Sequence, residues 1–248
     1  MKVKRKKIVI LGSTGSLGIK TLELLKKYKK HFEVVGLCAN KNSKLLKKQA
    51  QKFKVKDFVL AAKDGSKKIS ELISLGDIIV NVISGVAGIG PTEFALKLGK
   101  TLLLGNKESL VAEGRKIINL NRKNQIIPID SEHNAIYEIL KKYPNLKVEK
   151  IILPCSGGPF INKTQKQLAA VTAAQALNHP KWKMGKKISL ESATLINKGL
   201  EIIEAHYLFG LPLRKIMPVL HPECLVHGIV KFKEKTVGYF GNPDMREH

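Results

Sequence analysis

Two carboxylates, Asp130 and Glu132, stand one residue apart directly after the apolar run Ile126-Ile127. If that run is a strand that continues through them, its period of two residues directs both side chains to the same side. Carboxylates directed together into a cleft repel each other, so they need protons, Lys or Arg partners, or a hard divalent cation that prefers oxygen ligands. Taken alone, the pair favours a solvated loop over a cation site, so other parts of the chain must decide.

A second set of polar residues lies on a helix predicted over residues 189–209. Asn197 and Glu201 are four residues apart and therefore share one face of that helix, and Lys198 borders the face. These residue types can bind anions or complete a cation site. On an exposed helix they would form an ordinary salt-bridging face instead.

A glycine-rich turn, Gly12 to Gly18 with the sequence GSTGSLG, follows the apolar run of residues 7–11 and precedes a segment with helical periodicity. The glycines allow backbone N–H groups to approach a phosphate, and the helix N-terminus adds partial positive charge. The spacing G-x-x-G-x-x-G is a variant of the dinucleotide fingerprint. In this strand–turn–helix context it predicts nucleotide binding, with a merely structural loop as the alternative.

The second predicted strand, residues 33–39, ends in Asn40-Lys41-Asn42, where an NAD-binding domain usually carries an acidic residue. A carboxylate would repel the 2′-phosphate of NADP, whereas Lys41 and the two amides can receive it. The turn therefore favours NADP over NAD. An ordinary polar turn is the alternative.

Strands and helices alternate through the first half of the chain. We predict strands at residues 7–11, 33–39, 58–61, 77–83 and 101–104, and helices at 44–53, 69–75, 92–98 and 110–121. This alternation predicts a parallel, doubly wound sheet whose ligands lie at the carboxyl ends of the strands.

The pattern changes after Tyr143-Pro144-Asn145. A strand at 150–153, helical segments within 164–177, a loop at 178–185, the helix at 189–209, and strands of an antiparallel sheet near 219–220, 225–230 and 236–240 follow. The fold class is therefore α/β, with a Rossmann-like domain over residues 1–146 and an α+β domain over residues 147–248.

Composition limits the classes of partner. The chain has 44 basic and 20 acidic residues, but the excess is lysine spread over many segments, without the arginines and interleaved aromatic residues of a base-reading surface. We therefore expect no specific nucleic-acid partner. No apolar run reaches the roughly 18 to 20 residues of a membrane span. The three cysteines are widely spaced and show no Cys-x-x-Cys pattern, which fits a reducing cytosol.

Seven strings occur in order between Lys7 and Arg246: GSTGSLG, GNKESL, PIDSEHNAI, SGGPF, HPKWKMGKKIS, SATLINKGLEIIEA and NPDMR. Together they resemble the 1-deoxy-D-xylulose 5-phosphate reductoisomerase family of the non-mevalonate isoprenoid pathway. The resemblance implies an enzyme that uses NADPH and Mg²⁺ or Mn²⁺ to isomerise and reduce 1-deoxy-D-xylulose 5-phosphate to 2-C-methyl-D-erythritol 4-phosphate. It also implies a catalytic role for the α+β domain, a small phosphorylated sugar as substrate, and a homodimer. We expect a bacterial cytoplasmic location rather than a plastid one, because no transit peptide precedes the first predicted strand.

The resemblance assigns roles to individual residues. The metal ligands would be Asp130, Glu132 and Glu201, and the catalytic residues Lys107, Glu132 and Glu201. The substrate would contact Lys107, Ser131, Glu132, Ser156, His179, Ser192, Asn197, Lys198 and Glu201. The cofactor would contact Thr14, Gly15, Ser16, Leu17, Asn40, Lys41, Asn42, Asn106, Glu108 and Gly185. Trp182 and Met184 would lie on a closing flap within the loop at 178–185, for which a plain surface loop is the alternative.

The chain departs from the family pattern in three places. Family members continue past the NPDMR string into a C-terminal helical domain, whereas this chain ends at His248. The segment at residues 61–77 is shorter than usual, and Pro154-Cys155 precedes Ser156 where a small residue is usual. These departures leave a second hypothesis, a truncated and catalytically impaired relative that retains only nucleotide or partner binding.

Overall fold

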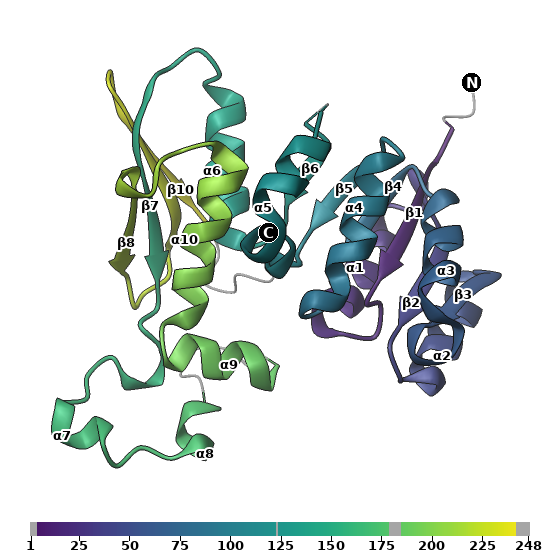
Figure 1. Ribbon diagram of the computed structural model, residues 1–248, viewed down its shortest axis with the longest axis horizontal. Coiled ribbons are helices and arrows are strands. Elements are labelled where there is room, and N and C mark those ends of the chain that lie inside the picture. The colour runs from purple at the N-terminus through teal and green to yellow at the C-terminus, as the bar shows by residue number, and fades with distance from the viewer. Residues whose placement is uncertain (1–3, 123, 179–184, 242–248) are drawn as a thin grey trace. The chain divides into compact units, whose positions relative to one another are not determined.

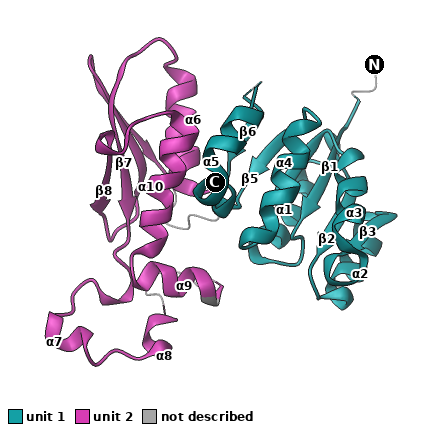
Figure 2. Cartoon of the chain, viewed as in Figure 1, with its two compact units in different colours: residues 1–129 teal, residues 130–248 magenta. Residues whose placement is uncertain are grey.

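The computed structural model describes residues 4–122, 124–178 and 185–241, and every structural statement below concerns these residues. The chain divides into two compact units, Met1–Ile129 and Asp130–His248 (Figure 2). The sequence placed this boundary later, at residue 146. The structure places it before helix α6 (Ser131–Lys142), because that helix packs on strands of the second unit.

The first unit contains a six-stranded parallel sheet with the order β3-β2-β1-β4-β5-β6 (Figure 1). Its strands are β1 (Lys6–Leu11), β2 (Phe32–Ala39), β3 (Asp57–Leu60), β4 (Ile78–Asn81), β5 (Thr101–Leu104) and β6 (Ile126–Pro128). Its helices are α1 (Ser16–Lys27), α2 (Ser43–Phe53), α3 (Ala61–Ser74), α4 (Ile89–Lys97) and α5 (Lys107–Leu120), with a 3₁₀ turn η1 (Val86–Gly88). The predicted Rossmann-like parallel sheet is confirmed.

The centre of this sheet is β1, which pairs with β2 on one side and β4 on the other. Residues 8–11 of β1 are buried, as a strand covered on both faces requires. The same core includes Leu22 and Leu25 of α1 and Leu46 of α2. Burial of these side chains holds the start of α1 at the carboxyl end of β1, where the glycine-rich turn lies.

The second unit contains a four-stranded sheet with the order β10-β9-β7-β8, formed by β7 (Val148–Cys155), β8 (Ile216–Leu220), β9 (Val226–Phe232) and β10 (Thr236–Phe240). Pairs β7–β9 and β9–β10 are antiparallel, but β7 and β8 are parallel. The expected purely antiparallel sheet is therefore wrong at β8. The reason is that a long helical connection carries the chain from β7 to β8, as a parallel pair requires.

The helices of the second unit are α6, α7 (Gln165–Leu168), α8 (Ala173–Ala176), α9 (Lys186–Ala193) and α10 (Ile196–Phe209), with 3₁₀ turns η2 (Gly158–Phe160) and η3 (Leu213–Lys215). Apolar residues of α6, α10 and the sheet form its core: Ile136, Ile139, Ile151, Leu153, Ala205, Ile216, Val230 and Phe232. Both α6 and α10 are thereby fixed on the sheet.

Two helix predictions need correction. The helix expected over residues 189–209 is two helices, α9 and α10, separated by Thr194 and Leu195, and Leu195 has a left-handed backbone with φ 59°. Helix α6 was not predicted as a helix at all. No helix among the described residues has the length and apolar character to cross a membrane.

Candidate active site

The second unit brings three carboxylates together, those of Asp130, Glu132 and Glu201. One carboxylate oxygen from each lies within 4.8 Å of the others. The structure therefore brings these three residues together. Their assignment as metal ligands stays a prediction.

Asp130 and Glu132 converge because a helix begins between them, which differs from the expected strand alternation. Asp130 is the N-cap of α6, and its Oδ1 accepts a hydrogen bond of 3.1 Å from the backbone N–H of Ser131. Glu132 lies in the first turn, where the positive end of the helix dipole stabilises a carboxylate. The Ser131 hydroxyl donates to Glu132 Oε2 at 2.5 Å and so fixes the rotamer of that carboxylate.

Helix α10 supplies the other half of the cluster. Asn197 and Glu201 share one face of α10, as their spacing predicted, and the side-chain amide of Asn197 donates to Glu201 Oε1. The ammonium of Lys198 donates to Glu132 Oε1 and to the carbonyl oxygen of Pro154, each at 2.6 Å, and it forms an ion pair with Glu201 Oε2. Lys198 therefore joins α6, α10 and the end of β7 at one point.

The charges of this cluster are nearly sealed from water, since Glu132, Lys198 and Glu201 are 7%, 6% and 1% exposed. Burial opposes ionisation of Glu132, but the charge and hydrogen bonds of Lys198 outweigh burial and hold the pKa of Glu132 below its ordinary value. Burial likewise lowers the pKa of Lys198, and the two glutamates outweigh it, so that pKa is raised. Both groups are thus charged at neutral pH.

The donor set fits a hard divalent cation. Asp130, Glu132 and Glu201 offer carboxylate oxygens, which Mg²⁺ and Mn²⁺ prefer. Three carboxylates against one ammonium leave two negative charges, and these match the charge of such an ion. The cluster differs from a site formed by metal ligands alone, because Lys198 pairs with two of the three carboxylates.

His133 and Glu204 were assigned no role from the sequence. Together with Asp130 they form a second group of side chains that could hold a metal ion. His133 Nε2 lies 2.9 Å from the carbonyl oxygen of Glu201, and His133 Nδ1 lies 3.7 Å from Glu204 Oε2. His133 also stacks on Phe209, with ring centroids 6.3 Å apart and 14° between planes. The position of Glu204, one turn after Glu201, was the available sequence signal.

Ser156 and Ser192 come from two segments that lie against each other. In the Ser156-Gly157-Gly158 turn, both glycines have positive φ, and a Cβ on Gly158 would lie 2.8 Å from the carbonyl oxygen of Ser192. Only glycine permits this close approach of turn and helix α9. The Ser156 hydroxyl accepts a 3.3 Å hydrogen bond from the Gly158 N–H. The two serines predicted to bind substrate are thus brought to one region.

In the first unit the glycine-rich turn has the backbone that the spacing predicted. Gly12 has φ 90°, and a Cβ there would lie 2.7 Å from the carbonyl oxygen of Val82. A Cβ on Gly18 would lie 2.6 Å from the Cα of Ser13. Thr14 is half-buried, whereas Gly15, Ser16 and Leu17 are exposed at the start of α1. The exposed part of the turn therefore coincides with the residues predicted to contact the cofactor.

Ser13, which was not predicted, anchors this turn from inside. Its hydroxyl donates to Gln49 Oε1 at 2.9 Å, and Gln49 Nε2 donates to the Ser13 carbonyl oxygen at 2.8 Å. Asn40, Lys41 and Asn42 are exposed at the end of β2. Asn42 Oδ1 caps α2 by accepting from the Leu45 N–H at 3.1 Å. Lys41 is thus exposed at the carboxyl end of a strand, as the NADP prediction requires.

Asn106 and Glu108 shape a neighbouring loop. Asn106 is buried, and its amide donates to the carbonyl oxygens of Ile83 and Gly85 at 2.7 and 2.8 Å and to Glu108 Oε2 at 3.0 Å. Glu108 Oε1 accepts from the Gly85 N–H at 2.9 Å. These bonds hold residues 83–85 against the start of α5. Contact of either residue with a cofactor stays a prediction.

Several predicted residues are not tied to the carboxylates by the structure. Lys107 is the first residue of α5 and belongs to the first unit, so its proximity to the carboxylates of the second unit stays a prediction. Gly185 is the exposed N-cap of α9. His179, Trp182 and Met184 lie outside the described residues.

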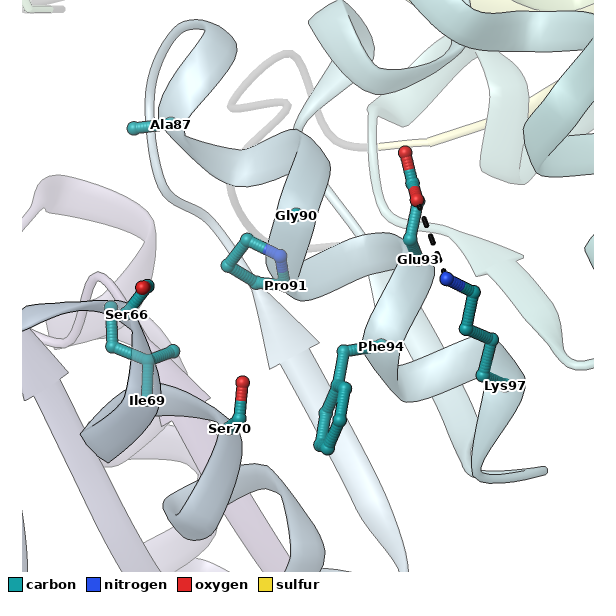
Figure 3. Close-up of a pocket in the computed structure, with 9 residues that line it drawn as sticks. All are labelled: Ser66, Ile69, Ser70, Ala87, Gly90, Pro91, Glu93, Phe94 and Lys97. Carbon is teal, nitrogen blue, oxygen red and sulfur yellow. Dashed lines mark ion pairs between the residues drawn. The ribbon is translucent and has the colours of Figure 1, made fainter.

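The first unit also contains a pocket of about 310 Å³ between α3 and the η1–α4 segment, separate from the predicted site residues (Figure 3). Its lining residues are Ser66, Ile69, Ser70, Ala87, Gly90, Pro91, Glu93, Phe94 and Lys97. Lys97 and Glu93 form an ion pair of 3.8 Å at its edge. This ion pair and the few other polar groups give the pocket no chemistry comparable to that of the carboxylate cluster.

Comparison with known proteins gives consistent matches over both units. The family described as 1-deoxy-D-xylulose 5-phosphate reductoisomerase matches residues 8–76 and 58–114, and the C-terminal domain of that reductoisomerase matches residues 126–209. The reductoisomerase of Halothermothrix orenii is 42% identical over 264 residues, which cover 98% of this chain and 69% of the relative. That of Persephonella marina is 44% identical over 252 residues, covering 97% and 67%.

Two solved structures agree. The reductoisomerase of Zymomonas mobilis in complex with NADPH has a TM-score of 0.86 and 34% identity, over 98% of this chain and 69% of that one. A DOX-P reductoisomerase in complex with NADPH, fosmidomycin and magnesium has a TM-score of 0.84 and 34% identity, over 97% and 67%. The chain thus spans about two thirds of the length of these proteins.

Proposed function

This chain belongs to the 1-deoxy-D-xylulose 5-phosphate reductoisomerase family, and on that basis we propose that it converts 1-deoxy-D-xylulose 5-phosphate to 2-C-methyl-D-erythritol 4-phosphate. The proposed reaction is an isomerisation followed by reduction with NADPH. A divalent cation, Mg²⁺ or Mn²⁺, assists it. Solved relatives that contain NADPH and magnesium support both cofactors.

The observation that carries the proposal is the convergence of Asp130, Glu132 and Glu201 beside Lys198. These side chains come from the start of α6 and from α10, which are far apart in the sequence. Their carboxylates would hold the cation. When bound, a divalent cation would polarise the substrate carbonyl and stabilise negative charge on its oxygen atoms.

The remaining polar groups of the second unit would position the substrate. Ser156, Ser192, Asn197 and Lys198 offer hydroxyl, amide and ammonium donors, which suit a phosphate and the hydroxyls of a sugar. Ser131 is already hydrogen-bonded to Glu132, so a contact between Ser131 and the substrate would couple substrate position to that carboxylate. We assign Lys107 to the same substrate, where it would add positive charge.

The first unit would bind NADPH. The exposed residues Gly15, Ser16 and Leu17 begin helix α1, and backbone N–H groups there can donate to the pyrophosphate. Exposed Lys41 would pair with the 2′-phosphate. Asn106 and Glu108 would shape the loop that borders the reactive end of the cofactor.

We further propose a homodimer, which light scattering of the purified chain tests.

The deciding experiment follows NADPH oxidation in the presence of 1-deoxy-D-xylulose 5-phosphate and Mn²⁺. We expect turnover by the chain and a loss of about 100-fold or more in Glu201→Gln, which removes one charge from the cation site. Glu149→Gln is the matched control, because Glu149 is an exposed carboxylate of the same unit that pairs with Lys231. Binding of NADPH without turnover would favour an impaired relative instead.

A further inference from the structure

The ammonium of Lys198 lies against carboxylates that a divalent cation would bind. It contacts Glu132 Oε1 at 2.6 Å and also Glu201 Oε2, so it bridges two of the three carboxylates of the cluster. Its third acceptor is the Pro154 carbonyl oxygen at 2.6 Å. The ammonium thus makes two hydrogen bonds and one further ion pair with three oxygen atoms. Lys198 thus already supplies a positive charge to both glutamates.

The other oxygens of the two glutamates are also engaged. Glu132 Oε2 accepts from the Ser131 hydroxyl, and Glu201 Oε1 accepts from the Asn197 amide. Each carboxylate oxygen of Glu132 and Glu201 therefore already faces one donor or cation. The neutral donors Ser131 and Asn197 can remain on the outer lone pairs, because each carboxylate offers about four acceptor sites.

A positively charged donor behaves differently from a neutral one. Two cations held against the same carboxylates in a buried site repel each other strongly, since water does not screen them there. The side chain of Lys198 is also the most adaptable of the three donors, with a four-carbon stem and a compact charge. Of the three donors, Lys198 is therefore the one that an incoming divalent cation displaces most readily.

We infer that Lys198 is an exchangeable resident cation: its ammonium holds Glu132 and Glu201 together until a divalent cation binds, and then leaves both carboxylates. The released ammonium becomes available to an anionic group of the substrate. Cation binding would in this way prepare substrate binding, and the two would be coupled. This inference rests on the proposed function, because it places the divalent cation at these carboxylates.

Reductive methylation of lysines by formaldehyde and a borane reductant, followed by mass spectrometry, tests the exchange on the full chain. A buried ammonium with three acceptors reacts slowly. We expect saturation with Mg²⁺ alone to raise the methylation rate of Lys198 several-fold. Lys231, which pairs with Glu149 at 3.0 Å and is 41% exposed, is the internal control and should keep its rate. Calorimetry on the same sample measures whether Mg²⁺ binds.

Three results are informative. Binding of Mg²⁺ with faster methylation of Lys198 supports the exchange. Binding with unchanged methylation overturns the exchange and leaves the proposed function standing. Absence of binding, tested beside Glu201→Gln, overturns both.

A variant supplies an independent measurement. Lys198→Met keeps the length of the apolar stem and removes the ammonium with its competing charge, so we expect the variant to bind Mg²⁺ about tenfold more tightly than the parent chain does. Weaker binding by this variant would show that the ammonium is part of the cation site and would overturn the inference. If the variant does not fold, the methylation experiment on the parent chain still decides.

Discussion

His133 Nε2 lies 2.9 Å from the carbonyl oxygen of Glu201, and this contact ties the first turn of α6 to the middle of α10. Both residues are buried, and each is adjacent to or part of the carboxylate cluster. A carbonyl oxygen only accepts, so His133 carries its proton on Nε2. The contact positions the backbone of Glu201 relative to Glu132, whose carboxylate comes from the neighbouring residue of α6.

Replacement of His133 by Phe should destabilise the second unit. The change keeps an aromatic ring beside Phe209 but leaves the Glu201 carbonyl without this donor, which costs about 1–3 kcal/mol. Urea unfolding measures the effect. The exposed His31 provides the control, since His31→Phe should change stability by less than about 0.5 kcal/mol. Equal stabilities of the two variants would show that the contact contributes nothing.

Asn106→Ala should destabilise the first unit by about 2–3 kcal/mol, because its buried amide serves the carbonyl oxygens of Ile83 and Gly85 and leaves them unpaired when removed. Asn42→Ala is the comparison, because Asn106 and Asn42 are the N-caps of α5 and α2, but Asn42 lies exposed and its loss should cost about 1 kcal/mol. Thermal unfolding of both variants gives the difference. A larger loss of stability in Asn42→Ala than in Asn106→Ala would contradict the inference that the buried hydrogen bonds of Asn106 stabilise the first unit more.

Gly18→Ala should distort the glycine-rich turn and weaken NADPH binding. The added Cβ meets backbone atoms of Ser13, which cannot move aside as a side chain can, so we expect a stability loss of about 1–3 kcal/mol. Gly90→Ala, where a Cβ meets nothing within 4 Å, should be neutral or slightly stabilising in helix α4. Fluorescence titration with NADPH compares the two. Unaltered binding by Gly18→Ala would argue against the turn as the cofactor site.

Acid should destabilise the protein partly through Glu132. Its folded-state pKa lies below the ordinary value of 4.5, so below pH 4.5 the unfolded chain takes up a proton that the folded chain does not. Stability from this group is complete above pH 4.5 and is lost as the pH falls through the folded-state pKa. Glu132→Gln should reduce the slope of unfolding free energy against pH there by up to about 1.4 kcal/mol per pH unit. An unchanged slope in Glu132→Gln would show that this carboxylate does not contribute to the acid sensitivity.

The parallel sheet could be predicted from the sequence because its strands are covered on both faces. Continuous apolar runs such as residues 8–11 leave little choice of structure. The glycine-rich turn was predictable for a related reason, since Gly12 and Gly18 occupy positions where a Cβ would meet backbone. Both features therefore have a local sequence signal, although the atom that a Cβ on Gly12 would meet belongs to Val82, far along the chain.

The start of α6 was missed because Asp130 and Glu132 fit a strand alternation as well as a helix N-terminus. The sequence did contain the helical signal: Asp130 as a cap, Glu132 in the first turn, and Ala135, Ile136 and Ile139 at helical spacing. The break at Leu195 had no such signal, because a leucine rarely adopts positive φ and only the surrounding structure can hold it there.

The relation of Lys198 to Glu132 was also beyond the sequence. The two residues are 66 positions apart, and their contact depends on how α6 and α10 pack on the sheet. Spacing within one helix predicted the pairing of Asn197 with Glu201, but it could not say that Lys198 turns toward another element. Long-range packing, which no local pattern encodes, decides the charge balance of the cluster.

Helix α10 carries Asn197, Lys198, Glu201 and Glu204 within little more than two turns. Successive residues of a helix are rotated by about 100°, so one inserted or deleted residue in this stretch would turn the later side chains away from the earlier ones. We therefore expect natural variation here to consist of substitutions, whereas residues 161–164 before α7 can change in number. A substitution in α10 keeps the angular positions of the other side chains around the helix, whereas an insertion or deletion changes them.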